Sequence, residues 1–189
     1  MLIALACVLA TAACQGDETK ADLSPLPTAA GPPYVCGHIP LKAVEVMTGV
    51  RDPLVRGYFD LKAAGGLGEG VCSVYQRDGE QLEVLQIDLT PGGYVEKVKE
   101  QLEGGALPLP EIVPGSVGYY FKPANSDKND AYSMLVRGKA ELNVQLETGV
   151  EGRDSAADVL ALMRLIAPKL ITDASSPSAK AASPSPENS

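Results

Sequence analysis

The feature that most constrains this chain is its N-terminus, where an uncharged apolar stretch from Met1 to Ala13 ends at Cys14. Such a stretch fits the apolar core of a secretory signal. It is too short to span a bilayer, which needs about 20 apolar residues. Small residues at Ala12 and Ala13 leave room for a peptidase, and the polar segment 15–18 follows. We therefore expect export, with residues 1–13 removed as a signal peptide.

The run from Leu9 to Cys14 resembles the bacterial lipobox, with Thr11 where a leucine is more usual. The resemblance implies lipidation of Cys14 and a location at the extracytoplasmic face of the plasma membrane, held there by a lipid anchor. No lysine or arginine precedes the apolar stretch, which departs from the usual signal pattern. An ordinary signal peptide with an incidental cysteine is the alternative.

Export also determines how the remaining cysteines, Cys36 and Cys72, are interpreted. An even pair in an exported protein predicts one disulfide, and closing that loop would stabilise the fold by roughly 3 to 4 kcal/mol. A metal site competes with this interpretation, but it needs further ligands, and His38 is the only histidine. We expect the disulfide, and no metal or other cofactor.

Composition separates one folded domain from two polar ends. Residues 14–35 and 171–189 are rich in Pro, Ala, Ser, Thr and acidic residues without an apolar period, which predicts a disordered stalk and a disordered tail. Residues 36–170 are then a single domain, long enough for its own core. The net charge of −8 argues against nucleic acid and against broad adhesion to anionic lipid.

Hydrophobic periodicity within the domain predicts three helices and five strands. The helices are expected over residues 40–47, 93–102 and 155–168. The strands are expected over residues 71–77 and 80–89, joined by an Asp78-Gly79 turn, and over 117–121, 131–136 and 140–147. This order predicts an α+β domain in which helices pack on one face of an antiparallel sheet of about five strands.

Two of these elements carry finer signals. Ser155 and Asp158 form a capping-box-like start to the last helix, and Pro168 is expected to end it. In the last strand Leu142 and Val144 alternate with the polar residue Asn143, which predicts one inward and one outward face.

Motifs that would indicate catalysis or metal binding are incomplete. Glycines between residues 65 and 70 precede a strand and lack the Gly-Lys-Ser/Thr of a phosphate loop. Asn125, Asp127 and Asn129 recur as in a calcium loop, but Asp130 stands where glycine is required. A single histidine and the lack of a Gly-x-Ser-x-Gly elbow leave little for acid–base or nucleophilic chemistry. We expect a protein that is not an enzyme.

An aromatic run provides the candidate binding residues. Strand alternation places Tyr119 and Phe121 on one face and Tyr120 on the other, which leaves Tyr120 for an exposed or groove position. Tyrosine is common at recognition surfaces. The apolar loop residues Leu107 and Leu109 are candidates with it. The alternative is that all of these side chains only pack within the domain.

The arrangement of Cys14, Cys36 and Cys72, with a Pro-rich stalk, a helix after Cys36 and a strand pair from Cys72, resembles actinobacterial lipoproteins with a paired-cysteine domain of unknown function. The resemblance covers residues 36–170. An aromatic residue expected two positions after the second cysteine is Val74 here, with Tyr75 next. The group has no assigned activity, so the resemblance implies a location and a fold and carries over no catalytic residue.

These observations together indicate a lipid-anchored, non-catalytic binding or accessory module of the bacterial cell envelope. Its expected partner is an envelope protein or an apolar ligand. The alternative function is a carrier that holds an apolar ligand between sheet and helices, which requires an apolar pocket of about 300 Å³ or more.

Overall fold

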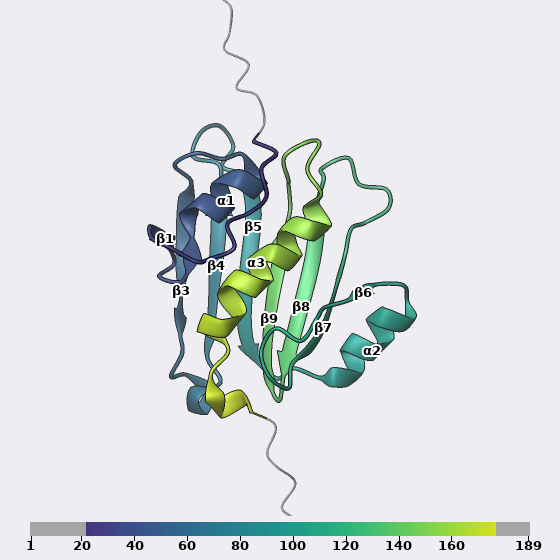
Figure 1. The fold of residues 1–189 in the computed structure, drawn as a ribbon. Helices are drawn as coiled ribbons and strands as arrows, with labels where there is room; N and C mark the ends of the chain where they lie inside the picture. Colours follow the sequence, from purple (N-terminus) through teal and green to yellow (C-terminus); the bar gives the residue numbers. More distant parts are fainter. Residues whose placement is uncertain (1–21, 177–189) are drawn as a thin grey trace, which may run out of the picture.

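One antiparallel sheet organises the structure, a computed structural model that describes residues 22–176 (Figure 1). Among these residues the strand order is β3-β4-β5-β9-β8-β7-β6, and β1 and β2 form a separate two-stranded ladder. The strands are β1 (Tyr34–Val35), β2 (Ile39–Pro40), β3 (Leu54–Asp60), β4 (Glu69–Tyr75), β5 (Glu83–Pro91), β6 (Leu107–Pro108), β7 (Val117–Phe121), β8 (Ala131–Arg137) and β9 (Ala140–Leu146).

The centre of the sheet is the pairing of β5 with β9, two strands far apart in the sequence. Ile87 lies opposite Val144 in this ladder, and Leu89 lies opposite Leu142. These four side chains have no solvent exposure, because the period of two places them on the same face as the other buried residues of both strands. This face is the main apolar core.

Two helices cover the apolar face, α1 (Leu41–Thr48) and α3 (Ser155–Leu170) (Figure 1). The third helix, α2 (Val95–Glu103), packs on the other face, at the β7–β8 end. There Val98 contacts Tyr119, Met134 and Val136 in a second, smaller core. The predicted α+β class and antiparallel sheet are confirmed; α1 and α3 share one face, and α2 lies on the opposite one.

Among the described residues the sheet has seven strands where about five were predicted, and the two additional strands are β6 at one edge and β3 at the other. The prediction missed β3 because its sequence has no regular alternation. Its central residue, Gly57, has a φ of +101°, and a Cβ there would lie 2.0 Å from the carbonyl oxygen of Val71. Glycine therefore allows β3 to approach β4. The strands β4 and β5 are joined by residues 76–82, closed by a hydrogen bond from the Gln76 amide to the Leu82 carbonyl. The predicted two-residue turn at Asp78-Gly79 was wrong.

The last helix begins and ends differently from its prediction. Asp154 is the N-cap, and its side chain accepts a hydrogen bond from the Ala157 amide at 3.1 Å. Ser155 instead donates to the carbonyl of Asp130. The helix continues two residues past Pro168. The proline ring removes one amide donor, but the last turn still closes through a hydrogen bond from the Ile171 amide to the Ala167 carbonyl.

Two buried arginines attach the ends of the described chain to the domain. Arg153 donates to the carbonyls of Asp22 and Ser24 at 2.7 and 2.8 Å. Arg137 donates to the carbonyl of Thr172 at 2.8 Å and to the hydroxyl of Ser176 at 2.9 Å. Residues 22–35 and 171–176 are therefore packed on the domain, which extends beyond the predicted limits of 36 and 170. Backbone carbonyls accept most of these hydrogen bonds, so the composition of the two segments did not reveal the attachments.

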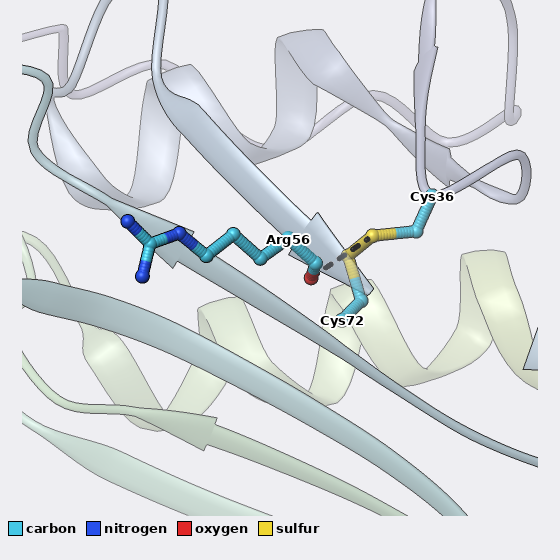
Figure 2. The surroundings of a disulfide bond; sticks show 3 residues. All are labelled: Cys36, Arg56 and Cys72. Carbon is cyan, nitrogen blue, oxygen red and sulfur yellow. Dashed lines mark hydrogen bonds between the residues drawn. A yellow bond between two sulfur atoms is a disulfide. The ribbon is translucent and has the colours of Figure 1, made fainter. Parts of the chain in front are cut away.

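The predicted disulfide joins Cys36, between β1 and β2, to Cys72 on β4, with a Cα–Cα distance of 6.0 Å. Figure 2 shows the bond passing the carbonyl oxygen of Arg56 on β3, which lies 3.8 Å from the Cys36 sulfur. The disulfide thus holds the small β1–β2 ladder, which leads into α1, across the edge strand of the sheet. Cys14 lies outside the described residues.

Replacing both cysteines, Cys36→Ser with Cys72→Ser, should lower the free energy of unfolding by about 3 to 4 kcal/mol, because the closed loop limits the unfolded chain. Urea unfolding followed by circular dichroism measures this difference. Adding a reductant to the unchanged protein should reproduce it. Equal unfolding midpoints for the oxidised protein and the variant would contradict the prediction.

Arg153→Ala should lower the free energy of unfolding by about 3 to 5 kcal/mol, because it leaves the buried carboxylate of Asp158 without its partner. Arg153 holds Asp158 through two hydrogen bonds of 2.7 and 2.6 Å. The same change should speed amide hydrogen exchange in residues 22–35, since their attachment is lost. Arg164→Ala, which replaces an exposed arginine of α3, is the control and should change neither quantity appreciably.

Candidate functional site

The predicted binding residues are only partly brought together. Leu107 on β6 lies opposite Tyr120 on β7. Leu107 is 52% exposed, but Tyr120 is half-buried against the main core, and Leu109 is buried in it at 8% exposure. The alternation predicted for the aromatic run is confirmed, since Tyr119 packs on the opposite face under α2. Leu109 is therefore a packing residue.

The only histidine of the chain lies apart from any nucleophile. His38 is half-buried with its ring 6.1 Å from that of Phe59, and its neighbour Cys36 is held in the disulfide. Burial, followed by the charge of Lys169, lowers the pKa of His38. The neutral ring thus fits a packing role.

The polar loop around Asn129 serves the fold. The Asn129 amide donates to the carbonyls of Val150 and Arg153 at 2.6 and 3.2 Å, and its oxygen accepts from Lys122 at 2.6 Å. This confirms a polar turn between strands. In residues 22–176 no group of three His, Cys, Asp or Glu side chains is placed to hold a metal ion.

One face of the sheet, opposite α1 and α3, was not predicted as a site. On β3, β4, β5 and β9 this face carries polar and aromatic side chains, and we call it the open face. Its side chains form rows across the strands, because residues in register point the same way. Two of these rows lie at the centre of the face, and beyond them Asp60 pairs with Glu69 and Thr90 pairs with Glu141. The first row is Arg56, Ser73, Gln86, Gln145 and, on β8, Tyr132; the second is Tyr58, Val71, Asp88 and Asn143.

Hydrogen bonds hold the polar side chains of the open face in place. Gln86 donates to both carboxylate oxygens of Asp88, at 3.0 and 2.9 Å. Tyr132 donates to Asn143 at 2.7 Å, and Asn143 donates to Glu141 at 2.9 Å. These contacts fix rotamers that would otherwise be free in water, so the face is preorganised.

The open face is partly dehydrated. Burial is the main cause that raises the pKa of Asp88, and the charge of Glu83 adds to it while Gln86 opposes it. Burial is also the main cause that raises the pKa of Tyr132 well above its ordinary value, and the neighbouring Tyr119 raises it further. Within residues 22–176 no lysine or arginine forms an ion pair with Asp88. Burial without a neighbouring cation makes a carboxylate harder to ionise, which raises its pKa.

A shallow hollow continues the open face at its β3–β4 end. Its volume is about 390 Å³, and Tyr58, Asp60, Glu69 and Val71 line it together with small residues of both strands. Tyr58 is 73% exposed and Val71 is 39% exposed. An aromatic ring and two carboxylates therefore border a space that is open to solvent.

Part of this site was foreseeable from the sequence. Alternation already indicated that Asn143 and its outward neighbours on β9 face away from the core. The residue opposite Asn143 is Asp88 on β5, and no local pattern specifies a pairing between strands so far apart in the sequence. The site was missed for this reason.

Comparisons of the chain with family models, with curated proteins and with solved structures gave no match. The resemblance to actinobacterial lipoproteins stays a prediction. In residues 22–176 no helix is both long and apolar enough to cross a bilayer.

Asp88→Asn should raise the stability of the fold at pH 7, because folding dehydrates the carboxylate without pairing it with a cation. The folded pKa lies above the unfolded value of 3.8, so folding takes up protons and stability falls as pH rises through that interval. The increase in the free energy of unfolding caused by Asp88→Asn should therefore be small below pH 3.8, grow above that pH and then level off. Urea unfolding at several pH values tests this.

The exposed carboxylate of Asp127 provides the matched control. Asp127→Asn should give no comparable gain that grows with pH. A loss of stability in Asp88→Asn at pH 7 would show that the carboxylate is held favourably and would contradict the prediction.

Proposed function

We propose that this chain is a non-catalytic binding or accessory module of the bacterial cell envelope, anchored by a lipid on Cys14 to the extracytoplasmic face of the plasma membrane. The observation that carries the proposal is the open face. A sheet with one covered face and one preorganised polar and aromatic face presents a ready recognition surface. Loops and helix ends are not needed to build it.

The groups of the open face support binding better than catalysis. Glu141 is paired with Lys97 at 3.5 Å, and Asp88 is tied to the amide of Gln86. Asp88 has no histidine, cysteine or lysine beside it on the two rows, and the lysine beside Glu141 is held in the ion pair. General acid–base or nucleophilic catalysis needs such a partner within hydrogen-bond reach.

The alternative carrier function gains no support from the space between sheet and helices. Val159, Leu162 and Ile166 of α3 have no solvent exposure, and they belong to one continuous core with β5 and β9. An apolar ligand there would have to displace close-packed side chains, which costs free energy.

The envelope location rests on the N-terminal pattern and agrees with the disulfide, because disulfides persist in oxidising compartments. Eight residue steps separate Cys14 from Asp22, where the described chain begins. A fully extended chain of that length spans no more than about 29 Å. A lipid on Cys14 would therefore keep the end of the domain near Arg153 close to the membrane.

Intact mass spectrometry of the protein from a native membrane fraction tests the anchor. We expect a chain that begins at Cys14, carries two or three acyl chains and gains the mass of two hydrogens on reduction. Cys14→Ser should abolish the acyl mass and release the protein from the membrane. An unlipidated native chain would overturn the proposed tether.

A further inference from the structure

The two rows of the open face carry almost no net charge, although the whole chain has a net charge of −8. They contain one carboxylate, Asp88, and one guanidinium, Arg56. The adjoining carboxylate of Glu141 is compensated by Lys97. Beyond the second row, Asp60 and Glu69 border the hollow and form no ion pair among residues 22–176. An anionic polymer is therefore repelled at this end of the face, since affinity and association rate depend on complementary charge.

The hydrogen-bonding groups on these rows suit a ligand that carries hydroxyl groups. An ionised carboxylate offers about four lone-pair sites, and among residues 22–176 only Gln86 donates to Asp88, at two of them. The remaining sites accept donors from outside. Asn143 donates to Glu141 and accepts from Tyr132, and Gln145 donates to Glu147. Among residues 22–176 each of these amides keeps a second N–H and a second lone pair for a ligand. A hydroxyl group both donates and accepts, so it satisfies such a mixed surface.

Tyr58 adds an apolar contact at the end of the second row. Its side chain is 73% exposed, and Val71 beside it is 39% exposed. A tyrosine ring packs against the C–H face of a saturated ring while its hydroxyl remains in water. The hollow beside Tyr58, of about 390 Å³, lies within the usual range for small-ligand sites. Asp60 and Glu69 on its rim would repel an anionic substituent.

We propose that the open face binds a neutral, polyhydroxylated chain, that is, a glycan segment. One ring would lie on Tyr58 in the hollow, and its neighbours would follow the second row past Asp88 toward Asn143. This inference rests on the proposed function and names the ligand class of the same site. A cationic peptide is the competing occupant; Asp60 and Glu69 would favour it, but Arg56 and the amide donors of the rows would not.

Titration of the isotope-labelled full-length protein in detergent, followed by NMR, tests the proposal with three probes. The probes are chitotetraose as a neutral glycan, an oligogalacturonate as an anionic one, and an oligolysine peptide. We expect chitotetraose alone to shift the amide signals of β3, β4, β5 and β9 in a saturable way.

Two variants locate the site. Tyr58→Ala should weaken chitotetraose binding about tenfold, which corresponds to roughly 1.4 kcal/mol. Tyr94→Ala, a matched control at the N-cap of α2 with 68% exposure, should leave binding unchanged. Asp88→Asn should weaken binding while its stability at pH 7 rises, which separates loss of a ligand contact from loss of fold.

The outcomes distinguish this inference from the proposed function. Saturable shifts with oligolysine alone, or no shifts with any probe, would overturn the glycan assignment. Equal loss of binding in Tyr58→Ala and Tyr94→Ala would place the ligand elsewhere and would also overturn it. The lipid anchor on Cys14 is tested separately by mass, so failure of the glycan assignment leaves the proposed envelope location standing.

Discussion

The structure depends on burial of one face of the β5–β9 pair beneath α3. Leu85, Ile87 and Leu142 have no exposure on the sheet side, and Leu162, Met163 and Ile166 have none on the helix side. Each fully buried side chain of this size contributes about 1.5 to 3 kcal/mol. Because β5 and β9 come from different halves of the chain, this contact joins the β3–β4–β5 meander to the β6–β9 meander in one sheet.

The same contact explains why much of the opposite face is left uncovered by helices. The short helix α2 buries only Val98 fully, against Tyr119, Met134 and Val136. Its length limits its cover to the β7–β8 end. The remaining strands must then present side chains that tolerate water, and they carry amides, a carboxylate and tyrosines. An antiparallel sheet with one covered face commonly has such a polar second face.

Local signals in the sequence were sufficient for the elements with clean periodicity. The strand at residues 117–121, the helix that Gly49 ends, and the Cys36–Cys72 disulfide all agree with the structure. The edge strand β3 was missed because Gly57 and Arg56 interrupt its apolar pattern. The packing of residues 22–35 was missed because a distant side chain, Arg153, binds backbone carbonyls that carry no sequence signal.

The two arginines also fix the two ends of the described chain at opposite ends of the strands. Arg153 fixes the incoming chain near the start of α3, and Arg137 fixes the outgoing chain beyond the end of α3. The described chain therefore enters and leaves at opposite ends of the sheet, as Figure 1 shows.

With a lipid on Cys14, the membrane would lie at the end where the described chain enters. The rows of the open face run across the strands, so a bound chain would lie along the membrane surface, as a polymer layered over the membrane does. A short tether is thus compatible with recognition of an extended ligand, because neither the bilayer nor the anchor occupies the face that binds it.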